Sequence, residues 1–411
     1  MRERLMSNSE LPKGWRECKL GDFISVKHGY AFKGKNITTE ANENILVTPG
    51  NFNIGGGFKK DKFKYFNDDY PSEYILNESD IIVTMTDLSK ESDTLGYSAK
   101  VPKSIKNEKY LHNQRIGLVQ FINQLCNKEY IYWLLRTREY QNYIVGSASG
   151  TSIMHTSPSR ICDYVFLCPP LAEQKAIAEV LSSLDDKIDL LHKQNQTLED
   201  MAQTLFREWF IEKADEGWEE MPLSEVADIK IGRTPPRKEK QWFSNDPKDV
   251  KWISIKDMGQ EGVFINGTSE YLTQEAVEKF KIPIIVKNTV ILSFKMTLGR
   301  VKITGENMLS NEAIAHFNIT NDKLYNEYLY LFLKTYPYQT LGSTSSIVTS
   351  INSAMIKNIL IILPDFKVKK SFKEVISPMF EKIQNNQKQI KTLEQTRDTL
   401  LPKLMSGQVR V

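Results

Sequence analysis

An internal repeat constrains the fold of this chain more than any other feature. Gly14-Trp15 and Gly217-Trp218 open two similar stretches, and Thr94-Leu95-Gly96 matches Thr297-Leu298-Gly299 at the same offset. Later pairs follow in the same order: Asn127–Tyr132 with Asn326–Tyr330, Gly146–Ser149 with Gly342–Ser345, and Thr197–Glu199 with Thr392–Glu394. A pattern that occurs twice in this way predicts two similar globular halves.

Each half is followed by a segment with the spacing of a coiled-coil helix. After Pro169-Pro170, and again from Ile376 onward, apolar residues alternate in the heptad pattern of a helix seam. The seam is expected to consist of Ile177, Leu181, Leu184, Ile188, Leu191, Asn195 and Leu198 in the first helix and of Ile383, Ile390, Leu393 and Leu400 in the second. Pro378 is expected to kink the second helix or to make it restart. The pattern leaves open whether the seams pair within one chain or form a zipper between two chains.

Together these patterns predict an α+β fold. Two similar mixed α/β domains are expected to be separated by two long antiparallel coiled-coil helices, related by an internal pseudo-twofold repeat. The expected segments are a first globular domain at 1–168, a central helix at 169–213, a second globular domain at 214–365 and a C-terminal helix at 366–411.

Composition narrows the classes of protein without choosing among them. The formal net charge is +3, so binding of nucleic acid has to come from local clusters of charge. The four cysteines form no C-x-x-C pair, which favours free thiols in a reducing compartment over zinc or disulfides. No apolar run has the length of a signal peptide core or a membrane span, so we expect a cytoplasmic protein with no membrane partner.

One stretch comes within a residue of a nucleotide-binding loop. In His28–Asn36 the residues Gly29, Gly34 and Lys35 have P-loop spacing, but Asn36 stands where the motif needs a hydroxyl for Mg²⁺. The counterpart in the second half keeps Gly232 and loses the second Gly-Lys pair. The shared element is a strand, a glycine turn and a basic loop, which favours contact with a phosphate backbone over a nucleotide pocket.

No other motif predicts catalysis. The chain lacks G-x-G-x-x-G, H-E-x-x-H and G-x-S-x-G, and its five histidines are scattered, so no catalytic and no metal-binding residues are expected. Phe58–Phe66 alternates aromatic and basic residues, which indicates an exposed strand with a lysine-rich face. We chose candidate DNA contacts by charge, polarity and position in loops: Lys33, Lys35, Asn51, Lys59, Lys60, Thr86, Ser147, Ser149, Arg233, Thr234, Arg237, Lys238, Lys256, Lys295, Arg300, Ser343 and Ser345.

The whole chain resembles the specificity subunit of a type I restriction–modification system. Ile231–Pro235 is close to the family's pattern at the start of a half, and His28–Lys33 is a looser version. Pro169–Ile177 looks like the family's entry into its central helix, and Leu400–Gly407 is very like its C-terminus. Leu363–Lys367 departs from the first junction, because it lacks Pro-Pro and Glu-Gln, so the start of the second helix is less well defined.

The resemblance implies a division of labour between subunits. The two globular domains are expected to be target-recognition domains that each read half of a bipartite, asymmetric sequence in double-stranded DNA, while the helices set the spacer. Two copies of a methyltransferase subunit, which carries S-adenosylmethionine, and restriction/translocase subunits that use ATP and Mg are the implied partners. No cofactor is expected in this chain itself.

Two other classes of protein remain open at this point. A dimeric coiled-coil DNA-binding regulator without enzymatic partners predicts self-association through the seam of the first helix. A methyltransferase with an unrecognised pocket predicts binding of S-adenosylmethionine by the isolated chain.

Overall fold

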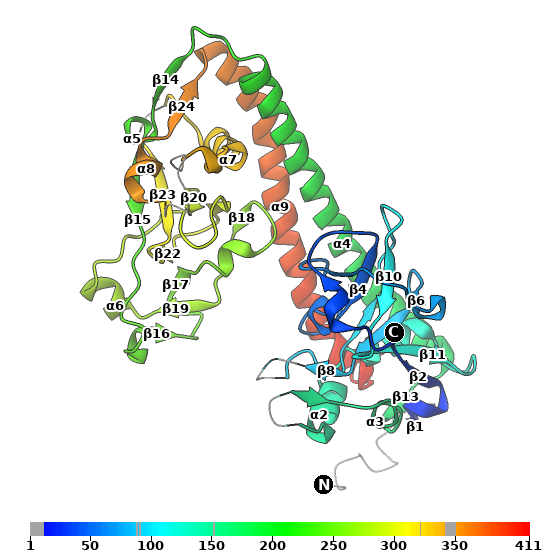
Figure 1. The fold of residues 1–411 in the computed structure, drawn as a ribbon. Coiled ribbons are helices and arrows are strands. Elements are labelled where there is room, and N and C mark those ends of the chain that lie inside the picture. The colour runs from blue at the N-terminus through cyan, green and yellow to red at the C-terminus, as the bar shows by residue number, and fades with distance from the viewer. Residues whose placement is uncertain (1–11, 88, 90–91, 151–152, 321, 342–350) are drawn as a thin grey trace. The chain divides into compact units, whose positions relative to one another are not determined.

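A computed structural model describes residues 12–87, 89, 92–150, 153–320, 322–341 and 351–411 (Figure 1). The chain divides into two compact units. Unit 1 comprises Met1–Asp186 with Leu393–Val411, and unit 2 comprises Lys187–Thr392. Each of the two long helices therefore contributes one segment to each unit.

Unit 1 is built around two β-sheets. The first sheet consists of β2 (Ile24–His28), β11 (Ile116–Phe121), β7 (Ile81–Thr84) and β9 (Ser98–Lys100). The second sheet consists of β3 (Ile37–Thr38), β5 (Lys64–Phe66), β4 (Asn44–Val47), β10 (Lys109–His112) and β6 (Ile75–Leu76). The order given is the order in space, and β4 runs parallel to β10. All four residues of β7 are buried, because this strand lies inside its sheet and is uniformly β-branched. Two short pairs, β1 (Arg16–Lys19) with β13 (Val165–Cys168) and β8 (Thr86–Asp87) with β12 (Met154–His155), flank the sheets.

The short helices of unit 1 begin at residues with capping side chains. They are α1 (Lys128–Leu134), α2 (Arg138–Ser147) and α3 (Pro158–Cys162), capped by Asn127, Thr137 and Ser157. The apolar and aromatic residues within Tyr130–Tyr140 predict, from the sequence, a single helix whose aromatic side chains lie in the core. The prediction of one helix was wrong, because Thr137 caps a new helix. Tyr130, Tyr132 and Trp133 are buried in the core of unit 1, which confirms the structural role expected of these side chains.

Unit 2 repeats much of this arrangement. Its first sheet has the spatial order β15 (Ala227–Ile231), β23 (Ile314–Ile319), β20 (Val290–Ser293), β21 (Val301–Thr304), β18 (Phe264–Ile265), and its second has β16 (Phe243–Ser244), β19 (Glu270–Leu272), β17 (Val250–Ile253), β22 (Leu309–Ser310). The pair β17–β22 is parallel, as β4–β10 is in unit 1. A short antiparallel pair, β14 (Glu219–Pro222) with β24 (Leu360–Leu363), lies where β1 and β13 pair in unit 1.

Helices complete the core of unit 2. The helices α5 (Leu223–Val226), α7 (Asn326–Thr335) and α8 (Ser353–Lys357) contribute buried residues to the core that includes the first sheet, whereas α6 (Gln274–Lys279) packs in a separate cluster with the second sheet. Tyr328 and Tyr330 of α7 are buried against Phe206 and Phe380 of the long helices. The aromatic face of this helix is therefore core as well.

The long helices are α4 (Leu171–Arg207), which continues into a π-helical turn at Glu208–Glu212, and α9 (Phe366–Met405). In unit 1, Arg397 of α9 bonds to Asp185 of α4 at 2.6 Å. In unit 2, Asn386 Nδ2 donates to Asn195 Oδ1 at 2.9 Å. Of the expected seam residues, Ile177, Leu181, Ile188, Leu191, Asn195, Ile383 and Ile390 are buried, and Leu184, Leu198, Leu393 and Leu400 are partly buried.

Pro378 does not make α9 restart. The helix is continuous from Phe366 to Met405, and Pro378 is exposed. On an exposed face the carbonyl that loses its partner to proline is hydrated by water, which lowers the cost of the missing hydrogen bond.

A buried lysine in unit 2 predicts a pH-dependent stability. Burial of Lys302 in β21 lowers its pKa to about 8, although its ammonium donates to the carbonyls of Gln260 and Gly262. In the unfolded chain the same group keeps its proton up to about pH 10.4. Between these values the unfolded state binds more protons, so this lysine makes unit 2 more stable as the pH rises, by about 1.4 kcal/mol per pH unit.

Lys302→Met is expected to remove this dependence. The free energy of unfolding, measured in urea at pH 7, 8.5 and 10, should rise with pH more steeply in the wild type than in the variant. Tyrosines and other lysines titrate alike in both proteins, so the difference between the two curves isolates Lys302. A difference that stays constant with pH would contradict the prediction.

Candidate nucleic-acid interface

In unit 2 the strand register brings three loops to one edge of the first sheet. Ile231 at the end of β15 pairs with Ala315, and Ser293 at the end of β20 pairs with Ile314. The loop 232–239, the loop 294–300 and the turn 311–313 therefore leave the sheet at the same edge. We call this edge, with its three loops, the loop edge of unit 2.

Unit 1 has a corresponding loop edge. His28 at the end of β2 pairs with Gly117, and Thr84 at the end of β7 pairs with Ile116. The loop 29–36, the segment that follows β7 and the turn 113–115 leave the sheet there. Gly96 donates its N–H to the carbonyl of Thr84 at 3.0 Å, as Gly299 does to Ser293 at 3.0 Å in unit 2.

The first glycine of each loop is required by a close approach of two backbones. A Cβ on Gly232 would lie 2.2 Å from Ser310 Oγ and 2.3 Å from the carbonyl oxygens of Ser310 and Asn311. A Cβ on Gly29 would lie 2.2 Å from the carbonyl oxygen of Asn113. The residues that follow make the same bond in both units: Arg233 N–H donates to Ser310 at 2.9 Å, and Tyr30 N–H donates to His112 at 2.8 Å. The glycine thus serves the packing of a turn against the loop.

Arg237 is a cation of the loop edge in unit 2 that is held by two aromatic rings and a carboxylate. Its guanidinium lies over the rings of Trp252 and Phe243, 4.6 Å and 4.5 Å from their centroids. Its two Nη atoms donate to the carboxylate of Glu270 at 2.6 Å and 3.1 Å. A guanidinium has five N–H donors, so this arrangement orients the group and leaves donors for a phosphate or a base.

The neighbouring candidates are less constrained. Arg233 is exposed and donates to the carbonyl of Phe280 at 3.0 Å. Thr234 donates to Glu312, a carboxylate in the turn 311–313. Lys238 is exposed at the end of the same loop. The structure therefore brings Glu312 to the loop that carries the candidates at 233–238. The sequence analysis did not select Glu312, whose carboxylate is an acceptor suited to a cytosine amino group.

The loop 294–300 adds two cations and an apolar tip. Arg300 donates to the carbonyl of Ile255 at 3.0 Å, which places it beside the exposed Lys256. Lys295 is exposed next to Phe294. Met296 is 93% exposed and has a φ of 63°, which is unusual for a side chain with a Cβ. Sequence reasoning missed Met296 because an apolar residue between strands looks like part of the core.

In unit 1 the basic candidates fall in two places. Lys33 and Lys35 are exposed in the loop 29–36. Lys59 forms an ion pair with Asp61 at 3.4 Å, and Lys60 is exposed beside it. The strand expected at Phe58–Phe66 is reduced to β5 at Lys64–Phe66, because Lys62 takes a φ of 50° and interrupts the extended backbone. Arg115, in the turn 113–115, is an exposed cation of this loop edge that the sequence analysis did not select.

Several polar candidates are committed to the fold of unit 1. Asn51 is buried and its amide oxygen accepts from the N–H of Thr48 at 2.9 Å. Thr86 is buried and bonds to the ring of His155 at 3.1 Å. These two side chains are not accessible to DNA in this structure, and their contacts give them a structural role. Ser147 donates to the carbonyl of Ile144, whereas Ser149 is exposed. Ser343 and Ser345 lie outside the described residues.

His112 and His316, which lie behind the two loop edges, add no charge to them. Burial lowers the pKa of His112 to about 4 and that of His316 to about 3, so both imidazoles behind the edges are neutral at physiological pH. Within the described ranges, no group of three or more His, Cys, Asp or Glu side chains is placed to hold a metal ion. No helix in the described part of the chain is long and apolar enough to cross a membrane.

The fold and its loop edges define a class of proteins with two mixed α/β domains, long helices and cationic loops. The family described as type I restriction modification DNA specificity domain matches residues 12–200 and again residues 215–395. This chain belongs to that family.

Known relatives agree with this membership. The type I restriction enzyme MjaIX specificity subunit of Methanocaldococcus jannaschii is 29% identical over 310 residues, which covers 69% of each chain. The MjaVIII specificity subunit of the same organism is 22% identical over 431 residues, covering 99% of this chain and 95% of the relative. The fold is similar to that of a type I restriction–modification S subunit from M. genitalium, with a TM-score of 0.55, 17% identity and 98% coverage of both chains.

Proposed function

We propose that this chain is the DNA specificity subunit of a type I restriction–modification complex, and that each unit reads one half of a bipartite, asymmetric target. The observation that carries the proposal is the double match to the specificity domain, since the first match lies mainly in unit 1 and the second mainly in unit 2. The loop edges support it, because the same sheet edge collects exposed cations in both units. Cationic loops position a protein on the phosphate backbone, and neighbouring polar groups read base edges.

The long helices are assigned the role of a ruler that sets the DNA spacer. We propose that α4 and α9 pair as an antiparallel coiled coil and relate the two domains by a pseudo-twofold repeat. Two contacts support this pairing: Asp185 bonds to Arg397, and further along α4 the partner of Asn195 is the earlier residue Asn386. A buried amide pair in a seam fixes the register of two helices. The proposed segments are 1–168 and 214–365 for recognition and 169–213 and 366–411 for the helices.

Catalysis belongs to partner subunits in this proposal. Two copies of a methyltransferase subunit supply S-adenosylmethionine and the transfer of its methyl group. Restriction subunits supply ATP- and Mg-dependent translocation and cleavage. This chain supplies recognition and the scaffold, and the complex acts in the cytoplasm. The family match favours this role over a dimeric regulator, whose DNA-binding domains would not be expected to match a specificity domain twice.

A genome-wide map of adenine methylation tests the proposal directly. Host cells that express the partner methyltransferase are compared with and without this gene. Loss of methylation at one two-part, asymmetric motif is the expected result, and it also identifies the target. An unchanged map, with the methyltransferase confirmed as present, would overturn the proposed function.

A further inference from the structure

One arginine of unit 1 joins the recognition domain to a long helix. Arg136 lies in the turn between α1 and α2 and is only 7% exposed. Its Nε donates to the carbonyl of Gly55 at 3.0 Å, and its Nη1 donates to Asp185 of α4 at 2.7 Å and to the hydroxyl of Tyr132 at 2.9 Å. The guanidinium also lies over the ring of Trp133, 4.4 Å from its centroid. A planar group held by three hydrogen bonds and a stacked ring has one allowed orientation.

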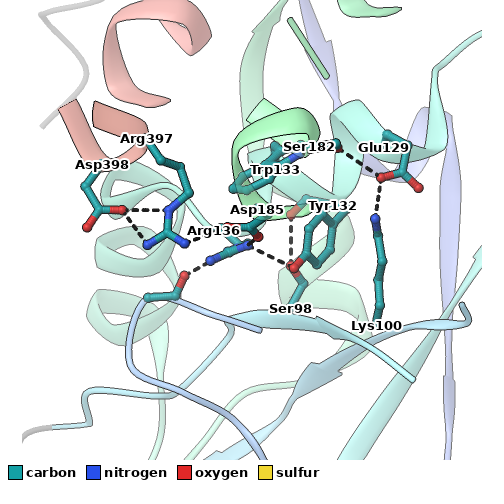
Figure 2. A network of polar contacts seen from close by, with 11 residues as sticks. Ser98, Lys100, Glu129, Tyr132, Trp133, Arg136, Ser182, Asp185, Arg397 and Asp398 are labelled. Carbon is teal, nitrogen blue, oxygen red and sulfur yellow. Dashed lines mark hydrogen bonds and ion pairs between the residues drawn. The ribbon is translucent and has the colours of Figure 1, made fainter. Parts of the chain in front are cut away.

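The carboxylate of Asp185 extends this connection to the second long helix. One oxygen of Asp185 accepts from Arg136 and the other accepts from Arg397 of α9 at 2.6 Å (Figure 2). Burial alone would raise the pKa of Asp185, but the two guanidiniums hold it below its ordinary value. Arg397 also pairs with Asp398 at 2.8 Å, so the buried charges are compensated.

The loop that receives Arg136 is shaped around it. Gly55, Gly56 and Gly57 have φ values of 82°, 87° and 94°, a backbone that only glycine adopts without strain. A Cβ on Gly56 would lie 2.7 Å from Arg136 Cγ and 2.8 Å from the carbonyl oxygen of Ser98. Ser98 accepts the N–H of Gly57 through this carbonyl, and its hydroxyl donates to the carbonyl of Tyr132. The loop, the strand β9 and the helix α1 are thus tied together around one side chain.

Unit 2 has a related arrangement at the matching place in the repeat. Tyr330 corresponds to Tyr132, and the residue four positions later is Lys334, where unit 1 has Arg136. Lys334 pairs with Glu199 of α4 at 3.2 Å, and Tyr330 donates to the same carboxylate at 2.7 Å. In both units, therefore, a tyrosine and a cation of the globular domain contact a carboxylate of α4. Only unit 1 uses a guanidinium, which fixes direction as well as distance.

We propose that Arg136, bridging Gly55, Tyr132 and Asp185, is a positioning residue that sets how strictly the complex discriminates the DNA spacer. The inference rests on the proposed function. One added base pair moves a half-site by about 3.4 Å and turns it by roughly a tenth of a helical turn. Discrimination of so small a change requires that the domain does not rock on the helices. Apolar packing has little directionality. The guanidinium of Arg136, in contrast, binds the loop at Gly55 and, through Asp185, both long helices, and its planar donors fix the geometry of these contacts.

The test compares targets that differ only in spacer length. The complex of this chain with its methyltransferase methylates DNA that carries the motif from the methylation map, or the motif with one base pair added or removed. The readout is the ratio of initial rates on the natural and altered spacers. Arg136→Met combined with Asp185→Leu removes the hydrogen-bonded guanidinium together with its carboxylate, and Arg397 keeps its ion pair with Asp398. Arg136→Lys keeps the charge at position 136 and leaves the Asp185–Arg397 pair in place.

A destabilised control separates positioning from stability. Val83→Ala truncates a buried residue of β7 and leaves the Arg136 contacts in place. We expect the ratio to fall at least tenfold in the double variant and by a smaller factor in Arg136→Lys, with no change in Val83→Ala. A cooperatively folded double variant with the wild-type ratio would overturn this inference alone. A wild-type complex that methylates no two-part motif would instead overturn the proposed function.

Discussion

Alanine at position 29 or 232 is expected to destabilise the unit that carries it by about 3 kcal/mol, the upper range for forcing an extra methyl group into a packed site. The Cβ on Gly29 would lie 2.2 Å from the carbonyl oxygen of Asn113 and 2.4 Å from that of His112. The Cβ on Gly232 meets Ser310 and Asn311 in the same way. The obstructing atoms include backbone oxygens, so the clash is relieved only by moving the turn away from the loop.

Matched controls are present in the same loops and sheets. Gly34 and Gly267 have open space where a Cβ would be, so Gly34→Ala and Gly267→Ala are expected to leave stability unchanged or to raise it slightly. Urea unfolding of the full chain, followed by hydrogen exchange to assign each transition to a unit, measures the four variants. If Gly29→Ala proves as harmless as Gly34→Ala, the steric account of the glycine turn is wrong. If the loop 29–36 were instead a phosphate-binding loop, Gly34 and Lys35 would be needed to bind ATP, and Gly34→Ala would weaken ATP binding.

The repeat and the heptad spacing carried most of the information about the fold. Gly29 and Gly232 occupy matching positions of the repeat, and in the structure each lies at the start of the corresponding loop, after β2 in unit 1 and after β15 in unit 2. The repeated residues therefore mark repeated structure. Boundaries were harder to predict, because they depend on single residues in context. Thr137 divides one expected helix into two by capping the second, and Lys62 interrupts an expected strand through its positive φ. Pro378 has the opposite effect, since its exposure allows α9 to continue.

The candidate site was predictable by charge and much less by position. Arg233, Arg237 and Lys238 belong to one loop edge because their basic cluster follows a strand, which sequence shows directly. Asn51 and Thr86 look like exposed loop residues in sequence, but their hydrogen bonds hold the fold together. The anchoring role of Arg136 had no sequence signal, because its partners Gly55 and Asp185 are distant along the chain and meet only when the domain packs on α4.

Replacing Arg233, Arg237 and Lys238 together by glutamine is expected to produce the largest loss of DNA binding. Arg233 and Lys238 are the expected phosphate contacts, and each such contact contributes about 0.9 to the slope of log affinity against log salt, so the slope should fall by about 2. Affinity of the assembled complex for its target should fall by roughly 10²- to 10⁴-fold, because each lost contact costs about 1–3 kcal/mol and the three need not add fully. Filter binding or anisotropy between 50 and 300 mM salt gives both quantities.

The single variants Arg237→Gln and Lys238→Gln distinguish a contact that reads a base from one that binds the phosphate backbone. Arg237 is oriented by Trp252 and Glu270, so Arg237→Gln should relax the base preference in one half-site, whereas Lys238→Gln should weaken all sequences alike. Lys357→Gln is the control, because α8 packs beside α5 at the start of β15, away from the loop edge where β15 ends. An unchanged salt slope in the triple variant would mean that this edge does not face the DNA backbone. Equal losses in Lys357→Gln and Lys238→Gln would mean that net charge, and not the loop edge, determines binding. A fall confined to the loop-edge variants, with altered preference in only one half of the target, requires that unit 2 reads that half through this edge.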